Sequence, residues 1–562
     1  EILSLAPTRL MVMPKVRLAL AQTNPVVGDI RANTDAAFAA IEQAVKKGAN
    51  LVLFGEMAIT GYPIEDLAAR ESFVSSAVKA VDELATRLNQ AGHGEIAVVI
   101  GHPALAANRD SHSWALAQNC ASVLLRGTVV GRYAKHHLPN YSVFDEYRIF
   151  VPGDELLTFE HHGLNFSTLI CEDIWQDGGP VAQLAKNSTD VVLVLNGSPF
   201  EIDKDDRRLE LVRKLASENA AAVAYVNLVG GQDDLVFDGD SLLVDAGGAL
   251  IGRAEQFSED LICFDIESKS DIEIVGKPRV AKIDDLEQIW NALVLGLRDY
   301  VNKNGFKSVI LGLSGGIDSA VCASIAADAI GAENVFGVSM PSRYSSEHSK
   351  SDADDSAERI GLHLRTESIE AMVNTFESQL GLNGIAAENL QARMRGVILM
   401  GLSNAEGHLT LTTGNKTELA VGYSTIYGDS VGGFAPIKDV EKTLVWKLAK
   451  WRNEDASNRG QTPPIPESSI TKPPSAELRP GQTDQDSLPD YELLDKLLDA
   501  YIEQRLGRDQ IVRQGFDLET VDRIISLVDR AEWKRRQGAI GPKITGMAFG
   551  RDRRLPITNR SK

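Results

Sequence analysis

The chain has few cysteines and no long apolar run. Its 562 residues include 4 cysteines, and no two of them form a CxxC pair, so the spacing of a zinc knuckle or a dithiol redox motif is missing. So few cysteines fit a reducing compartment, and we expect a cytoplasmic protein. No apolar run approaches the ~20 residues that a membrane-spanning helix needs, so we expect no membrane partner.

Basic residues are also scarce relative to acidic ones. Lys and Arg number 58 against 78 Asp and Glu, which gives a formal net charge of −20. A charge of this sign argues against a nucleic-acid partner. An acidic protein that handles phosphates must gather its basic residues locally or use Mg²⁺ to offset the phosphate charge. The length predicts two to four domains.

The first residues lack the basic start and apolar core of a secretory signal. Residue 1 is not Met, and we expect Met11 or Met13 to be the natural start. The first predicted domain therefore begins at residue 14.

Short apolar segments alternate with amphipathic segments over residues 14–268. Several of the apolar segments lack polar alternation, as expected for strands of a sheet that is covered on both faces. The helical spacing of apolar residues predicts a helix over 33–47, and 127–133 is typical of the second arm of a hairpin. The other predicted strands lie at 16–22, 51–54, 96–101, 120–125, 167–171, 191–196, 222–227 and 261–266.

A charged segment, 269–283, is predicted to be an interdomain linker, and the second domain covers 284–562. The side chain of Asp284 is suited to cap the first helix of that domain, and 335–340 is a further predicted strand. Residues 463–489 are rich in Pro, Ser, Thr and Asp and are too long for a simple connection. They form either a lid or a disordered loop.

A glycine-rich turn follows the apolar segment 308–313 and leads into a helix; it reads Ser314-Gly315-Gly316-Ile317-Asp318-Ser319. Such a turn offers a nest of backbone N–H groups that suits phosphate oxygens. No Lys follows the glycines, so this is not the GxxxxGK[ST] loop. A glycine turn is also a common plain strand–helix connection. With its serines and aspartate at fixed offsets, it resembles the pyrophosphate loop of the ATP pyrophosphatases, which cut ATP between the α- and β-phosphates.

Three residues of the first half, Glu56, Lys135 and Cys171, each stand just beyond a predicted strand. The carboxyl ends of strands in an α/β fold converge on one edge, where sites tend to lie. A thiol with a carboxylate base and an ammonium beside it has what acyl transfer needs, since the base forms the thiolate and the cation stabilises the oxyanion. Taken singly, the cysteine is as compatible with a core position, and the other two with solvated side chains.

The strings around these residues resemble the nitrilase family in order and rough spacing: FGEMAITGYP, YAKHHLPNY and ICEDIW. The resemblance implies an α-β-β-α sandwich with a catalytic triad. It implies that Glu56 is the general base, Lys135 the oxyanion stabiliser and Cys171 the nucleophile.

The string LPNYSVFDEYR, 138–148, resembles the glutaminase domain of the glutamine-dependent NAD⁺ synthetases. The resemblance implies that Tyr141, Ser198 and Lys204 hold glutamine. By itself Ser198 is equally typical of a turn, and Lys204 of a surface charge. Glu146 is either a second carboxylate near the triad or the partner of a neighbouring arginine.

A second turn, from Thr413 to Glu418, follows the apolar segment 409–412 and enters a helix. Mg²⁺ prefers carboxylate oxygens that it shares with phosphates. Asp318 and Glu418 are therefore the candidate metal ligands. The alternative for Glu418 is a simple charge in the first turn of a helix.

Further strings of the second half resemble the same synthetases: ENLQARMRG, GYST, PIKD, SITKPPSAELRP and EWKRRQ. The resemblance implies that ATP contacts Gly312, Leu313, Ser314, Gly315, Gly316, Ile317, Asp318, Ser319, Thr413 and Lys438. It implies that deamido-NAD⁺ contacts Asn389, Glu418, Lys534, Asp429 and Arg393. Within this family, 463–489 is expected to cover the synthetase site.

The resemblance covers about residues 15–558 and implies an ATP-dependent ligase of α/β fold. A nitrilase-like α-β-β-α sandwich would hydrolyse glutamine to glutamate and ammonia. A Rossmann-like ATP-pyrophosphatase domain, adenine nucleotide α-hydrolase-like in fold, would adenylate deamido-NAD⁺ with ATP and Mg²⁺ and amidate it to NAD⁺, releasing AMP and pyrophosphate. The resemblance also implies a homo-oligomer. Two alternatives stay open, a different acceptor acid and a binding protein without catalysis.

Overall fold

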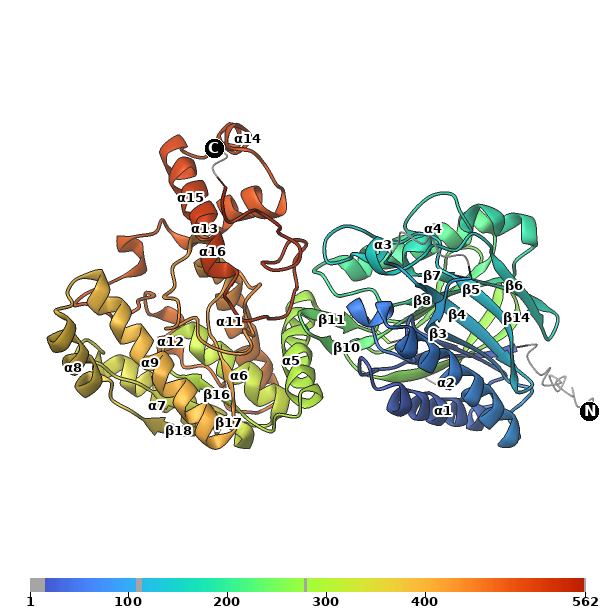
Figure 1. Ribbon diagram of the computed structural model, residues 1–562, viewed down its shortest axis with the longest axis horizontal. Coiled ribbons are helices and arrows are strands. Elements are labelled where there is room, and N and C mark those ends of the chain that lie inside the picture. The colour runs from blue at the N-terminus through green and yellow to red at the C-terminus, as the bar shows by residue number, and fades with distance from the viewer. Residues whose placement is uncertain (1–15, 108–113, 277–279, 560–562) are drawn as a thin grey trace, which may run out of the picture.

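The computed structural model describes residues 16–107, 114–276 and 280–559 (Figure 1). The expected natural start, Met11 or Met13, lies outside these ranges. The chain forms two α/β bodies that lie side by side (Figure 1). They are joined through α5 (Asp285–Lys303) and the hairpin of β10 (Val229–Gln232) and β11 (Leu235–Asp238).

The first body contains a seven-stranded sheet with the order β15-β14-β1-β2-β3-β4-β5. Strand β2 runs parallel to β1 and β3, and the remaining pairs are antiparallel. The strands are β1 (Val16–Gln22), β2 (Leu51–Phe54), β3 (Ala97–Leu105), β4 (Ala117–Leu125), β5 (Thr128–Ala134), β14 (Asp260–Ser268) and β15 (Asp271–Val275).

A six-stranded sheet, β13-β12-β9-β8-β7-β6, packs face to face with the first. Its strands are β6 (Leu157–His161), β7 (Leu164–Ile170), β8 (Val191–Asn196), β9 (Ala222–Asn227), β12 (Leu242–Val244) and β13 (Leu250–Arg253). Helices α1 (Ile30–Lys46) and α2 (Glu71–Gln90) cover the outer face of the first sheet, and α4 (Lys204–Asn219) packs against the second. The predicted α-β-β-α sandwich is confirmed.

Strand β1 explains why the apolar segments lack polar alternation. Leu18 and Leu20 lie in the core between the sheets, whereas Ala19 and Ala21 contact the layer of α1 and α2. Both faces of this strand are therefore buried, and the small alanines leave room for helices. The predicted hairpin is also present, because β5 pairs antiparallel with β4.

The second body holds a parallel sheet of order β18-β17-β16-β19, which confirms the Rossmann-like fold class. Its strands are β16 (Val309–Gly312), β17 (Val335–Ser339), β18 (His363–Thr366) and β19 (Leu409–Leu411). Asp284 caps the first helix as predicted, since its side chain accepts from the backbone N–H groups of Leu286 and Glu287. The main helices around the sheet are α5 (Asp285–Lys303), α6 (Ile317–Ile330), α7 (Glu347–Ile360), α8 (Glu370–Leu380), α9 (Ile385–Glu406), α10 (Lys416–Val421) and α11 (Lys442–Asn458).

A smaller helical group follows the sheet and packs around the buried side of α10. It begins after the segment 463–489, which contains the short α12 (Glu467–Thr471). The group consists of α13 (Tyr491–Leu498), a π-helical turn (Asp499–Glu503), α14 (Arg508–Arg513), α15 (Leu518–Arg530) and α16 (Glu532–Arg535).

The predicted linker, 269–283, is shorter in the structure. Its first part forms β15, which pairs with β14 and becomes the edge of the first sheet. We therefore place the domain boundary between Val275 and the start of α5. The charged composition of this stretch suits an exposed edge strand, which charged side chains protect from pairing with another chain.

A hairpin formed by β10 (Val229–Gln232) and β11 (Leu235–Asp238) reaches from the first body to α5 of the second. A Cβ at Gly231 would lie 2.9 Å from the Cα of Gly296, so the close approach requires glycine. The ammonium of Lys303 donates to the carbonyl of Gly231 at 2.9 Å and to the side chain of Asn24 at 2.8 Å. These buried contacts set the position of one domain against the other.

Candidate active sites

The first candidate site lies where β2, β5 and β7 end. Lys135 Nζ is 2.9 Å from Glu56 Oε1, and both side chains are fully buried. The amide of Asn119 donates to the same carboxylate at 2.6 Å, and the backbone N–H of Gly197 donates to its other oxygen at 2.8 Å. These contacts hold the Glu56 carboxylate and the Lys135 ammonium in one orientation.

Cys171 follows β7 directly and opens a short 3₁₀ turn. Its φ of +42° is in the left-handed region that side chains avoid. Strain of this kind is frequent where a side chain must be presented at a site. Burial raises the pKa of the thiol well above its usual range, the charge of Glu56 adds to this, and Lys135 opposes it. The thiol therefore needs a base to become a nucleophile.

Glu146, for which the sequence left two readings, joins this site. Its Oε2 lies 2.9 Å from Lys135 Nζ, and Tyr62 donates to its Oε1 at 2.8 Å. The pKa of Glu146 is raised to about 7, because burial raises it more than the charge of Lys135 lowers it. One buried ammonium is thus shared by two carboxylates, behind a buried thiol.

Of the residues expected to hold glutamine, Ser198 is buried, Lys204 is largely buried and Tyr141 is half exposed. The pKa of Lys204 is lowered to about 8, because burial lowers it more than the charge of Glu201 raises it. The Lys204 Nζ atom lies 3.5 Å from Glu201 Oε1. The hydroxyl of Tyr141 donates to Glu172 at 2.9 Å. Sequence reasoning missed Glu172; the one available signal was its position directly after Cys171.

Arg208 supports the loop that carries Ser198. Its guanidinium pairs with Asp238 at 2.7 and 2.8 Å and donates to the backbone carbonyls of Ser198 and Pro199. Two hydrogen bonds to the Asp238 carboxylate and two to backbone carbonyls help to satisfy a charge that would otherwise be costly to bury.

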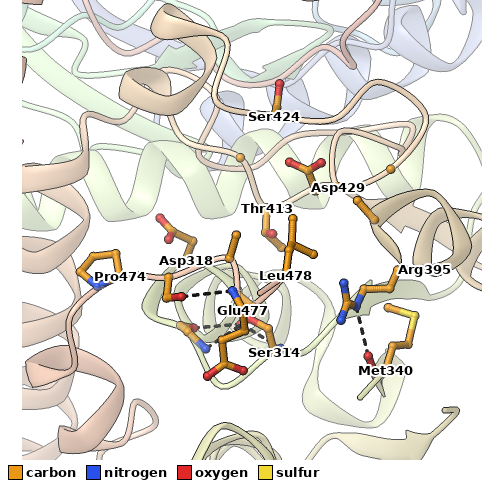
Figure 2. Close-up of a pocket in the computed structure, with 18 of the residues that line it drawn as sticks. Ser314, Asp318, Met340, Arg395, Thr413, Ser424, Asp429, Pro474, Glu477 and Leu478 are labelled. Carbon is orange, nitrogen blue, oxygen red and sulfur yellow. Dashed lines mark hydrogen bonds between the residues drawn. The ribbon is translucent and has the colours of Figure 1, made fainter. Parts of the chain in front are cut away.

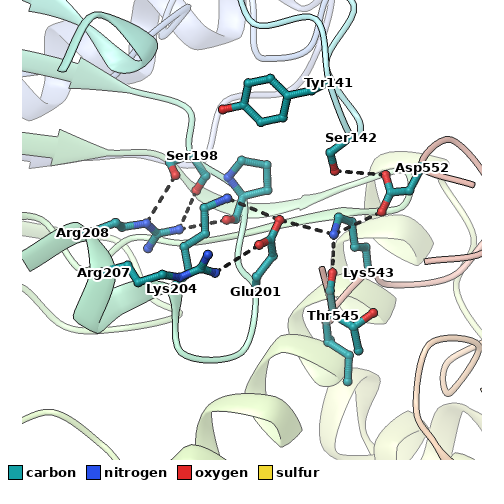
Figure 3. A network of polar contacts seen from close by, with 12 residues as sticks. Tyr141, Ser142, Ser198, Glu201, Lys204, Arg207, Arg208, Lys543, Thr545 and Asp552 are labelled. Carbon is teal, nitrogen blue, oxygen red and sulfur yellow. Dashed lines mark hydrogen bonds and ion pairs between the residues drawn. The ribbon is translucent and has the colours of Figure 1, made fainter. Parts of the chain in front are cut away.

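Polar contacts connect this site with the second domain (Figure 3). The ammonium of Lys543, 1% exposed, lies 3.3 Å from Glu201 and 3.2 Å from Asp552. Ser142, next to Tyr141, donates to Asp552 at 3.3 Å. The C-terminal segment of the second domain therefore contacts the loops that surround Lys204.

The second candidate site is a cavity of about 470 Å³ at the carboxyl ends of β16, β17 and β19 (Figure 2). This is the edge where ligands bind in open parallel sheets. The glycine-rich turn lines it at the start of α6, with the Ser314 and Ser319 side chains hydrogen-bonded to one another. Other residues expected to contact ATP also line the cavity: Gly312, Leu313, Gly316, Ile317, Asp318 and Thr413.

Gly315 packs closely against α7 and is not among the residues that line the cavity. Its φ is +76°, and a Cβ there would lie 2.3 Å from the carbonyl oxygen of Ser349. Only glycine meets both conditions, so the residue shapes the turn without itself lining the cavity.

Asp318 and Glu418 meet as predicted, and a third residue joins them. The ammonium of Lys442, on α11, is 2.5 Å from Asp318 Oδ2 and 3.1 Å from Glu418 Oε1. Asn415 caps α10 and also donates to Asp318 at 2.9 Å. The pKa of Glu418 is raised to about 7, because burial raises it more than the charge of Lys442 lowers it. Sequence reasoning missed Lys442 because it lies 24 residues beyond Glu418.

The donor set fits a cation that is shared with phosphates. Both carboxylates line the cavity and supply the hard oxygens that Mg²⁺ prefers. Among the described residues, no group of three or more His, Cys, Asp or Glu could hold a metal ion by itself. Further ligands would therefore have to come from a bound nucleotide.

The residues expected to contact deamido-NAD⁺ divide into two groups. Asn389, Glu418 and Asp429 line the cavity. Arg393 is exposed and donates to the carbonyl of Ile426 at 3.2 Å, outside the cavity wall. Lys534 lies behind the wall, where its ammonium donates to the carbonyls of two residues that line the cavity, Gly422 and Ser424, at 2.8 Å each.

Lys438, expected to face ATP phosphates, lies outside this cavity. Its ammonium donates to the carbonyl of Ala539 at 2.6 Å. Both residues line a void of about 20 Å³ that shares Thr412 and Gly414 with the main cavity.

The segment 463–489 crosses the cavity opening and is an ordered cover, not a disordered loop. Ser469 donates to the carbonyl of Gly315 at 3.0 Å, and Lys472 donates to Ser349 at 2.8 Å. Glu477 accepts from the Ser349 hydroxyl at 2.7 Å. Each of these bonds joins the cover to the glycine-rich turn or to the start of α7.

In the part of the chain that the structure describes, no helix is long and apolar enough to cross a membrane.

Comparison with known proteins identifies two families along the chain. Residues 17–271 match the carbon-nitrogen hydrolase family, and residues 289–538 match the NAD synthase family. Glutamine-dependent NAD(+) synthetases of Acinetobacter baylyi and Aquifex aeolicus are 46% and 42% identical to this chain, covering 97% of it and 99% of their own length in both cases.

A solved structure is similar over the same extent. The glutamine-dependent NAD+ synthetase from Acinetobacter baumannii, in complex with adenosine diphosphate, has a TM-score of 0.75 and 44% identity. The similarity covers 97% of this chain and 98% of that one.

Proposed function

Because this chain belongs to the family of glutamine-dependent NAD(+) synthetases, we propose how its residues divide the reaction between two sites. The chain is an ATP-dependent carbon–nitrogen ligase that takes nitrogen from glutamine and makes NAD⁺. The first domain hydrolyses glutamine, and the second activates and amidates deamido-NAD⁺. The roles of single residues given below are proposals.

In the first site, the carboxylate of Glu56 takes the thiol proton of Cys171. The sulfur attacks the amide carbon of glutamine, and the Lys135 ammonium stabilises the negative charge that develops on the amide oxygen. The C–N bond breaks, and ammonia leaves with the proton held by Glu56. Water, deprotonated by the same carboxylate, then hydrolyses the thioester to glutamate and restores the thiol.

Glutamine is held by groups at the mouth of this site. Tyr141, Ser198 and Lys204 donate hydrogen bonds to its polar atoms, and Glu172 accepts from its α-ammonium. Glu146 keeps Lys135 charged and in place, since the buried ammonium has two carboxylates to offset its desolvation.

In the second site, the nicotinate carboxylate of deamido-NAD⁺ attacks the α-phosphorus of ATP. The bond to the bridging oxygen breaks, and pyrophosphate leaves from the turn formed by Ser314–Ser319, whose N–H groups suit phosphate oxygens. Ammonia then attacks the acyl carbon, loses one proton and displaces AMP. Adenylation is needed because a carboxylate oxygen is a poor leaving group.

Asp318 and Glu418 would hold a Mg²⁺ that ATP brings with it, and the ammonium of Lys442 would contact the phosphates. The ion would offset phosphate charge in the cavity. The cover, 463–489, would keep water from the acyl adenylate, which water otherwise hydrolyses.

Ammonia must travel between the sites without gaining a proton. We propose that ammonia enters the second site through the void beside Lys438. The volume of this void, about 20 Å³, has room for one small molecule. The segment after Ala539 leads from this void toward the first domain, where the N–H of Lys543 donates to the carbonyl of Asp234 at 2.8 Å.

We also propose that the protein forms a homo-oligomer. Ile385 and Val397 on α9 and Leu380 on α8 are 74%, 58% and 60% exposed. Large apolar side chains exposed on the two helices support contact with a second copy of the chain. A cytoplasmic location is supported by the use of ATP and by four cysteines that form no disulfide.

The Lys135 ammonium, buried between Glu56 and Glu146 behind Cys171, carries the proposal. The test is the variant Cys171→Ala. Glutamine-driven synthesis of NAD⁺ should fall by at least about 10³-fold, whereas synthesis from added ammonium should stay within about threefold of the parent protein. NAD⁺, AMP and glutamate are measured together. An equal loss with both nitrogen sources would contradict the assignment of separate sites.

A further inference from the structure

Helix α9 presents one face to the nucleotide cavity. Asn389, Ala392, Arg395 and Leu399 line the cavity, at helical spacing. Arg393, on the outer side, is exposed. Figure 2 shows the Arg395 side chain at the cavity edge beside Met340. The cation that α9 brings to the cavity is therefore Arg395 and not the arginine that the sequence motif favoured.

The Arg395 guanidinium has little to satisfy it within the protein. Its Nε donates to the carbonyl of Met340 at 3.1 Å. Within the described ranges, no other hydrogen bond and no carboxylate within 4.0 Å is found for it. By contrast, the buried Arg208 has a carboxylate partner and two backbone carbonyls. Arg535 donates to three backbone carbonyls and to Glu532.

An arginine in this state indicates a missing anion. A guanidinium carries five donors, so Arg395 retains four N–H groups beyond the one used. Burial lowers its pKa to about 10, and the charges of Asp429 and Glu477 oppose this only in part. Arg395 is half-buried and lines the cavity, so its remaining N–H groups are accessible to an anion that enters there.

The surroundings indicate which anion this is. Two apolar side chains, Met340 and Leu399, line the cavity together with Arg395. Asn389 and Asp429 line the same cavity. Arg395 thus lines the same cavity as the glycine-rich turn and the residues expected to contact the acid substrate.

Resting on the function proposed above, we propose that Arg395 binds anionic oxygens of the two nucleotides at the adenylation step. The oxygens belong to the ATP α-phosphate or to the carboxylate that attacks it. Two anions must approach each other in this step, and a guanidinium between them reduces their repulsion and stabilises the charge on the transferring phosphoryl group. Glu146, Cys171 and the rest of the first site do not take part.

The experiment measures exchange of labelled pyrophosphate into ATP in the full-length protein, which reports adenylation alone. Arg395→Gln should lower the kcat/KM of deamido-NAD⁺-dependent exchange by about 10²–10³-fold. Arg395→Lys should recover part of the loss, and guanidinium ions should partly restore Arg395→Ala. A raised KM for ATP assigns the contact to the α-phosphate, and a raised KM for deamido-NAD⁺ assigns it to the carboxylate.

Two controls keep the test decisive. The melting transition of the second domain reports folding of each variant, and Arg365→Gln, on β18 with Glu367 as its partner, should leave exchange unchanged. The inference is overturned if exchange in Arg395→Gln stays within threefold of the parent, or if neither Lys nor guanidinium restores any of it. If the parent protein itself shows no exchange with deamido-NAD⁺, the proposed function fails instead.

Discussion

Replacing Lys442 with methionine removes the buried ammonium that lies between the half-buried carboxylates of Asp318 and Glu418. It pairs with Asp318 at 2.5 Å and with Glu418 at 3.1 Å, and its side chain is 2% exposed. Methionine keeps most of the aliphatic stem but not the charge. Removal of one partner from a buried ion pair costs about 3–5 kcal/mol of stability.

This free energy predicts a shift in the melting temperature. A domain the size of residues 284–562 has an unfolding entropy of about 0.6 kcal/mol/K, so 3–5 kcal/mol corresponds to roughly 5–9 °C. Scanning calorimetry of the full chain measures the shift in the transition of this domain. Lys450→Met, an exposed position on the same helix, is the matched control and should shift it by less than about 1 °C.

The loss in Lys442→Met should also depend on pH. Burial, and then the charge of Asp318, raise the pKa of Glu418, and Lys442 opposes both. Without Lys442 the pKa rises beyond about 7, so the folded variant holds a proton that the unfolded chain has released. Stability then falls as pH rises from the unfolded value through this window. The deficit should be larger at pH 8.5 than at pH 6, and an equal deficit at both, or one below 2 °C, would refute the reasoning.

The first site and the domain contact give two further predictions. Glu146→Gln should lower glutaminase activity and flatten its pH profile. The parent carboxyl has a pKa of about 7, so it gains a proton as pH falls and then no longer neutralises Lys135. Steady-state rates from pH 5.5 to 8.5 check this, and an unchanged acid limb contradicts it. Lys543→Met should reduce glutamine-driven synthesis several-fold more than ammonium-driven synthesis, since Glu201 and Asp552 lose their shared partner; an equal effect on both would exclude a role in the contact between domains.

The sequence was sufficient for the two sites as local motifs. Cys171 and the turn at Ser314–Ser319 stand directly after apolar segments, and a residue at the end of a parallel strand reaches the same edge in most α/β folds. The helix cap at Asp284 was equally local. For the linker, 269–283, charge was an unsafe signal, because an exposed edge strand such as β15 is charged as well.

The roles of single polar residues depended on partners from distant segments. Lys442 and Lys438 are both lysines near the start of α11, yet one contacts two carboxylates in the cavity and the other donates to Ala539 outside it. The family resemblance implied a substrate contact for Arg393, but in the folded helix α9 it is Arg395 that lines the cavity.

The amino-acid sequence by itself determined where the candidate reacting groups stand along the chain, because strand patterns and turn motifs depend on neighbours within a few residues, and the family resemblance implied the two folds and their order. Only the tertiary structure decided which charges meet: the ammonium of Lys135 with Glu146, Lys442 with Glu418, and Lys543 with Glu201. Electrostatic partners are chosen by distance in space, and folding sets that distance through contacts between segments far apart along the chain.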